Sequence, residues 1–79
     1  MNTQELSQRV TKVVCNVLKV DAAMVEPSSN FVFDLGAEST QSIQLVAGFE
    51  EEFGVEFDNE AALKVQTVGD AIQFIGTYV

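Results

Sequence analysis

The sequence predicts an all-α fold, a small four-helix bundle of three longer helices plus one short helix. Apolar residues recur at helical spacing along most of the chain. Segments in which apolar and polar residues alternate as in a strand are absent, and clusters of turn-forming residues separate the helical stretches. The 79 residues form a single domain, 1–79. Cys15 is the only cysteine, so no internal disulfide can form and helix packing has to stabilise this small core.

The first helix is expected to begin after Asn2, which is a good N-cap and has Glu5 three residues later, as in a capping box. Its apolar stripe follows steps of three and four residues and consists of Leu6, Val10, Val13, Val14 and Val17, with Leu18 at the border. A long loop, 19–38, joins the first and second helices, and we expect one short helical turn within it at 20–25.

The second helix is expected from about Ser39 to Phe53, and Gly54 after it is a good C-terminal stop. Its predicted apolar positions are Ile43, Val46, Phe49 and Phe53, flanked by Leu45 and Ala47. A short third helix is expected at 59–64. The last helix begins near Thr67 and uses the apolar residues Val68, Ala71, Ile72, Ile75 and Tyr78.

Two features of the second helix leave alternatives open. Gly48 costs the helix up to about 1 kcal/mol relative to alanine, so it indicates close packing, room for a ligand or a harmless surface position. The acidic run 50–52 lies near the negative end of the helix dipole, where acids are unfavourable. It is either an exposed, solvated run or a surface that binds a basic partner.

The chain is strongly acidic, with 12 acidic against 4 basic residues and a net charge of −8. No base occurs between Lys19 and Lys64. Such a charge disfavours nucleic acid and anionic membranes and favours partners with basic surfaces. Because no apolar stretch is long enough to span a bilayer and no signal-peptide pattern is visible, we expect a cytoplasmic monomer.

No catalytic group or metal site is visible in the sequence. The chain has no histidine, and no base lies near Ser39 in sequence to activate a nucleophile. A single thiol cannot form a zinc site. We therefore expect no enzymatic activity and no metal; a small hydrolase is the weaker alternative and would show ester turnover by the isolated protein.

The most informative stretch is 33–40, where a turn built on Gly36 meets the start of the second helix at Ser39. Local chemistry favours Ser39 as an N-cap, and a covalently modified hydroxyl is the other interpretation. The run Asp-Leu-Gly-Ala-Glu-Ser at 34–39 resembles the acyl carrier protein signature Asp-Leu-Gly-Ala-Asp-Ser-Leu. The likeness continues in register at 50–57 and 67–72, so it spans nearly the whole chain.

This resemblance implies that Ser39 is esterified by 4′-phosphopantetheine, which a phosphopantetheinyl transferase takes from coenzyme A. Acyl groups would be held on it as thioesters for fatty-acid, polyketide or specialised lipid synthesis. The family shelters such chains between its second and third helices, and the matching positions are Ile43, Val46, Ala47, Phe57, Ala62 and Leu63. Acyl-transferring and synthase enzymes with basic surfaces would recognise Glu38, Thr40, Gln41, Ile43, Gln44, Ala47, Glu50 and Glu51.

Several positions depart from the family pattern. Glu38 replaces the aspartate before the serine, and Thr40 replaces the leucine after it. Gln41 and Gln44 replace acids, and Ala47 replaces a methionine. These changes predict altered partner choice. A peptidyl or aminoacyl carrier is the near alternative, and an unmodified acidic interaction module with the same fold is the more distant one.

Overall fold

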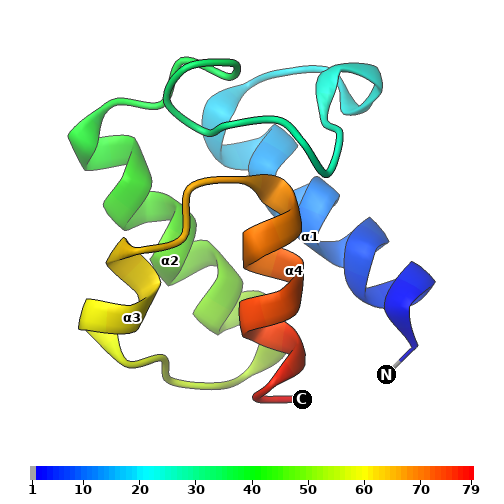
Figure 1. Ribbon diagram of the computed structural model, residues 1–79, viewed down its shortest axis with the longest axis vertical. Coiled ribbons are helices and arrows are strands. Elements are labelled where there is room, and N and C mark those ends of the chain that lie inside the picture. Colours follow the sequence, from blue (N-terminus) through cyan, green and yellow to red (C-terminus); the bar gives the residue numbers. More distant parts are fainter. Residues whose placement is uncertain (1) are drawn as a thin grey trace.

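The computed structural model describes residues 2–79, and this part of the chain forms four α-helices and no β-strand. The helices are α1 (Thr3–Leu18), α2 (Ser39–Phe53), α3 (Asn59–Leu63) and α4 (Val68–Gly76), and a 3-10 turn, η1, spans Ala22–Met24. Figure 1 shows α1, α2 and α4 around a common centre, with the short α3 beside α2 and α4. The predicted bundle of three longer helices and one short helix is confirmed. None of these helices is long and apolar enough to cross a membrane.

The N-terminal ends of α1 and α4 are capped as the sequence predicts. Asn2 Oδ1 accepts a hydrogen bond from the Glu5 N–H at 2.7 Å, and Thr67 Oγ1 accepts one from the Asp70 N–H at 3.1 Å. At the end of the α1 stripe, however, Leu18 lies in the core, whereas Val17 is only half-buried. The prediction that Leu18 stands at the border of the stripe is therefore wrong.

The helix α2 has the predicted bounds but turns a different face to the core. Leu45 is 4% exposed and Phe49 is buried one turn later, whereas Ile43 is 66% exposed. Ile43 precedes Leu45 by two residues, which is about 200° around a helix, so the two side chains leave it on nearly opposite sides. Placing Ile43 on the core stripe and Leu45 at its flank was wrong, because packing against α1 and α4 selects the buried face.

The contact between α1 and α2 explains Gly48. A Cβ atom at this position would lie 2.9 Å from Val13 Cγ1 and 3.6 Å from Val17 Cγ2, so a side chain does not fit without displacement. Among the alternatives, close packing is the reason for the glycine. On the same side, Arg9 Nε donates to Glu52 Oε2 at 2.8 Å, and its guanidinium lies 4.7 Å from the centre of the Phe53 ring.

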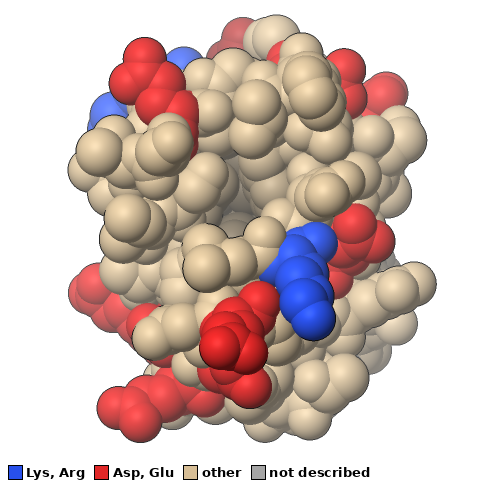
Figure 2. All heavy atoms as spheres, turned by 60° about the vertical axis from the view of Figure 1, so that its left-hand side comes forward, with Lys and Arg blue, Asp and Glu red and all other residues tan. Residues whose placement is uncertain are grey.

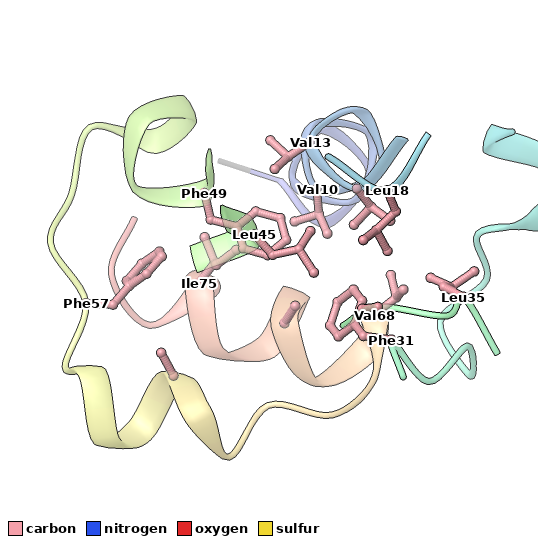
Figure 3. Packing of buried hydrophobic residues seen from close by; sticks show 14 of the residues in the cluster. Val10, Val13, Leu18, Phe31, Leu35, Leu45, Phe49, Phe57, Val68 and Ile75 are labelled. Atoms are coloured by element: carbon pink, nitrogen blue, oxygen red, sulfur yellow. The ribbon is translucent and has the colours of Figure 1, made fainter. Parts of the chain in front are cut away.

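The core of residues 2–79 joins the four α-helices and two loop segments, and Ala62 is the buried residue that α3 contributes. Figure 3 shows Val10 from α1, Leu45 from α2 and Ile75 from α4 near its centre. Phe31, from the loop before α2, lies toward one end of this core, and Phe57, from the segment between α2 and α3, lies at the other. The buried cluster therefore extends along α2 and reaches the segments that precede and follow it.

Candidate functional site

The segment before α2 is a turn fixed by its own side chains. Asn30 Oδ1 accepts hydrogen bonds from the N–H groups of Val32 at 2.9 Å and Phe33 at 3.0 Å. Asp34 Oδ2 in turn accepts one from the Asn30 N–H at 2.6 Å. The buried side chains of Phe31 and Leu35 anchor this turn in the core. The turn is thus held by polar contacts on its outside and apolar contacts on its inside.

Gly36 supplies the change of direction that leads into α2. Its φ of +72° is left-handed, a conformation that glycine adopts without steric cost. A Cβ atom there would meet nothing within 4 Å, so the backbone conformation rather than lack of space requires glycine. The following Ala37 is buried, and its N–H donates to the Phe31 carbonyl at 2.7 Å.

The same segment is hydrogen-bonded to the start of α4. The Phe31 N–H donates to the Gln66 carbonyl at 2.9 Å, and the Val68 N–H donates to the Ser29 carbonyl at 3.0 Å. Asn30 and Thr67 form an isolated antiparallel bridge between these bonds. This connection could not be predicted from the sequence, because the two backbone segments are far apart in the chain and carry no local pairing signal.

Ser39 is the first residue of α2, and the residue that caps the helix is Glu38. The Glu38 N–H donates to Gln41 Oε1 at 2.9 Å, and its carbonyl accepts from Ser42 Oγ at 3.3 Å. The local prediction that Ser39 is the N-cap is therefore wrong. Its side chain is exposed, and within residues 2–79 its hydroxyl has no hydrogen-bond partner. This oxygen is available to a reagent from solvent.

A cavity of about 520 Å³ opens beside Ser39 and extends between α2, α3 and α4. Its volume lies within the roughly 300–1,000 Å³ typical of small-molecule sites. Among the six positions predicted to shelter an acyl chain, the ones that line it are Ile43, Val46, Phe57, Ala62 and Leu63. Ala47 is exposed on α2 and does not line it.

The mouth of the cavity is apolar and exposed. Phe33 is 88% exposed, Leu63 71%, Ile43 66% and Val32 53%, and all four line the cavity together with Ser39. Figure 2 shows a hollow on one face of the molecule whose immediate surroundings are mostly uncharged. Exposed apolar clusters of this kind mark binding surfaces more often than isolated exposed residues do. The exposure of Phe33 could not be predicted, because apolar type alone favours burial.

The three consecutive glutamates near the end of α2 have different environments. Glu50 Oε2 accepts a hydrogen bond from the Phe57 N–H at 2.9 Å, and Glu52 pairs with Arg9 at 2.8 Å and Lys12 at 3.5 Å. The hydrogen bond from Arg9 is the largest cause that holds the pKa of Glu52 below its ordinary value of 4.5. Only Glu51 is exposed and without a partner among residues 2–79. The run is therefore neither uniformly solvated nor uniformly available to a partner.

The other positions predicted to meet partner enzymes lie on the outer surface of α2. Thr40, Gln44 and Ala47 are exposed, and Gln41 is half-buried, with its side chain engaged by the Glu38 N–H. No group of three or more potential metal ligands occurs within residues 2–79. The chemistry available at Ser39 is thus that of an unpartnered alcohol at a helix N-terminus, next to an apolar cavity.

Comparison with known proteins agrees with this arrangement. Residues 8–75 match the family model described as the phosphopantetheine attachment site. The chain is 48% identical to the acyl carrier protein of Sinorhizobium fredii (strain NBRC 101917 / NGR234) over 71 residues, which cover 90% of this chain and 91% of that protein. The same values hold for the acyl carrier protein AcpP of Rhizobium meliloti (strain 1021). A solved structure assigned as an acyl carrier protein from Mycobacterium tuberculosis is similar in fold, with a TM-score of 0.87, 23% identity and coverage of 94% of this chain and 99% of that one.

Proposed function

We propose that Ser39 is the residue to which phosphopantetheine is attached, because the chain belongs to the phosphopantetheine-attachment family. Acyl carrier proteins match it over nearly their whole length. The protein is a carrier of acyl intermediates on a covalently attached 4′-phosphopantetheine. When bound, this group supplies a thiol on which an acyl chain is held as a thioester. A role in fatty-acid synthesis is consistent with the named relatives.

The residues around Ser39 fit such a group. Its hydroxyl is exposed and unpartnered within the described range 2–79, so a transferase does not have to break a hydrogen bond to reach it. The N–H groups at the start of α2 lack helical acceptors and carry the positive end of the helix dipole, which favours a phosphodiester beside them. The apolar cavity that Ser39 lines offers a place for an acyl chain out of water. The single observation that carries the proposal is this hydroxyl at the cavity mouth.

The protein itself is proposed to perform no catalysis. Within residues 2–79, no base is hydrogen-bonded to the Ser39 hydroxyl, and the nearby Asp34 carboxylate accepts from the Asn30 N–H instead. A nucleophilic serine requires such a base. A separate phosphopantetheinyl transferase therefore activates the alcohol, which argues against the small-hydrolase alternative.

Partners of this family include transferase and synthase enzymes, and we propose that they approach the outer surface of α2. Thr40, Gln44 and Glu51 are exposed there, beside the site or further along the helix. Glu50 is a weaker candidate than the sequence implied, because its carboxylate is hydrogen-bonded to the Phe57 N–H. Free Cys15 is compatible with a cytoplasmic location, which remains part of the proposal.

The test is intact-mass measurement of the protein after incubation with a phosphopantetheinyl transferase, coenzyme A and magnesium. The wild type is expected to gain the mass of one phosphopantetheine, and Ser39→Ala is expected to gain none. Ser42→Ala is the matched control, because Ser42 lies one helical turn away and also lines the cavity. Modification of Ser39→Ala, or an unmodified wild type under conditions in which a known carrier is fully converted, would contradict the proposal and favour an unmodified interaction module.

A further inference from the structure

The cavity ends at an aromatic residue that lies far from Ser39. The helix α2 has 15 residues and is therefore about 22 Å long, with Ser39 at its first position. Phe57 follows the end of this helix and still lines the cavity. Figure 3 shows its side chain at one extremity of the buried cluster, beyond Phe49 and Ile75. Phe57 thus forms a wall at the end of the cavity opposite the attachment residue.

The ring of Phe57 is held by two other rings. Its centre lies 5.1 Å from that of Phe74 and 5.0 Å from that of Tyr78, and the centres of Phe74 and Tyr78 are 5.2 Å apart. Each pair is tilted or edge-on, with interplanar angles of 58°, 72° and 64°. These are favourable arrangements for aromatic pairs. Each ring therefore contacts the other two, and Phe57 cannot move without disturbing both neighbours.

The backbone on both sides of this ring is also fixed. The Phe57 N–H donates to Glu50 Oε2 at 2.9 Å, and the Asp58 N–H donates to the Tyr78 hydroxyl at 3.2 Å. The first bond ties Phe57 to α2, and the second ties it to the end of the chain after α4. A side chain held in this way acts as a fixed wall rather than as a flexible filler.

We propose that Phe57, braced by Phe74 and Tyr78, determines the length of acyl chain that the cavity shelters. The proposal rests on the proposed carrier function and adds a specificity-determining residue to it. An acyl chain that ends before the Phe57 ring is sheltered along its whole length. In a longer chain, only the carbons in excess of this length remain in water.

The test compares thermal stability across a series of acyl forms. The protein is loaded with saturated acyl groups from butanoyl to hexadecanoyl, and the Tm of each form is compared with that of the unacylated holo form of the same variant. In the wild type, Tm is expected to rise by up to about 3–6 °C for each methylene buried and then to level off. In Phe57→Leu, the plateau is expected at a longer chain, because leucine is smaller than phenylalanine.

Phe53→Leu is the matched control, because Phe53 is half-buried on α2 beneath Arg9 and does not line the cavity. Its plateau is expected at the wild-type chain length. Referring each Tm to the same variant's holo form removes any general loss of stability. A plateau that is unchanged in Phe57→Leu, or that moves equally in Phe53→Leu, would overturn the assignment of Phe57.

A second measurement does not depend on Ser39. Linear alcohols of increasing length are titrated into the unmodified protein, and their Kd values are measured by NMR. Affinity is expected to improve by about fourfold for each methylene buried and to stop improving at a shorter chain in the wild type than in Phe57→Leu. Failure of the transferase to modify Ser39 would contradict the carrier proposal alone, whereas identical alcohol series for the two proteins would overturn the role of Phe57.

Discussion

The two sides of α2 differ in how closely the neighbouring helices approach it. On the side of α1, the backbone approaches so closely that a Cβ at Gly48 would lie 2.9 Å from a Val13 methyl group, and Arg9 binds both Glu52 and the face of Phe53. On the side of α3, a cavity of about 520 Å³ separates the elements, and residues such as Leu63 remain largely exposed. One helix thus takes part in a closed interface and in an open one.

This difference shows how a small domain can contain a cavity of this size and still fold. A cavity costs stability, because the side chains that line it make fewer contacts with other protein atoms. The tight packing of α1 against α2 and α4 supplies stability that does not depend on the occupancy of the cavity. We therefore expect substitutions on the closed side to alter the free energy of unfolding, and substitutions at the mouth of the cavity to leave it nearly unchanged.

The largest expected effect comes from shortening a buried leucine of α1 that lies beside α4 rather than at the cavity mouth. Leu6→Ala is expected to lower the free energy of unfolding by about 2–5 kcal/mol, because the Leu6 side chain of α1 is buried in the core and its truncation leaves a cavity. Leu63→Ala is the matched control and is expected to change it by less than about 0.5 kcal/mol, since Leu63 is 71% exposed. Urea unfolding measures both. Equal losses would show that the two sides do not differ in stability as described.

A smaller effect is expected where the helices touch most closely. Gly48→Ala gains up to about 1 kcal/mol of helix propensity but places a Cβ against Val13, and overpacking costs about 1–3 kcal/mol. We expect a net loss of about 1–2 kcal/mol in urea unfolding. The same substitution in a Val13→Ala background should be less harmful, because the clashing methyl group is absent. A gain in stability from Gly48→Ala in the wild-type background is inconsistent with a closed interface.

The smallest effect is expected from the charge on Glu52, and it depends on pH. The hydrogen bond from Arg9 lowers the pKa of Glu52 in the folded state. The Glu52 carboxylate therefore contributes its full stabilisation when the pH is above the ordinary pKa of 4.5, and this contribution is lost as the pH falls through the lowered pKa. Glu52→Gln should therefore be less stable than the wild type at neutral pH and should approach it in acid. Urea midpoints measured from about pH 7 to about pH 3 test this.

Glu51→Gln provides the control for this pH dependence. Glu51 is adjacent in sequence but exposed, and it has no partner among residues 2–79. Its difference from the wild type is expected to stay small and nearly constant across the same range. A difference between Glu52→Gln and the wild type that persists unchanged in acid would mean that the carboxylate charge does not stabilise the closed side.

Local signals in the sequence predicted the helices well. The cap at Asn2, the cap at Thr67 and the stop at Gly54 depend on neighbouring residues only, and each is found where expected. The inward anchoring of Phe31 and Leu35 was also predictable, because large apolar side chains in a loop favour burial. The likeness of 34–39 to the acyl carrier protein signature depends only on the order of the residues, so it could be recognised without the structure.

Other features depend on contacts between distant parts of the chain. Which face of α2 is buried is decided by α1 and α4, so Ile43 and Leu45 exchanged their expected roles. Glu50 could not be linked to Phe57 from sequence, since seven positions separate them and a turn lies between. The capping role of Glu38 was missed because serine is the stronger capping residue in isolation.

The backbone bridge between Asn30 and Thr67 limits how the protein can be divided. A fragment that stops before Gln66 would lose the Gln66 carbonyl, which accepts from the Phe31 N–H, and the Val68 N–H, which donates to the Ser29 carbonyl. It would also lose the helix that follows. The turn in front of Ser39 would then lack its main external support. Swapping α2 together with its preceding loop into another carrier therefore requires transplanting 66–69 as well, so that the graft brings both halves of this bridge.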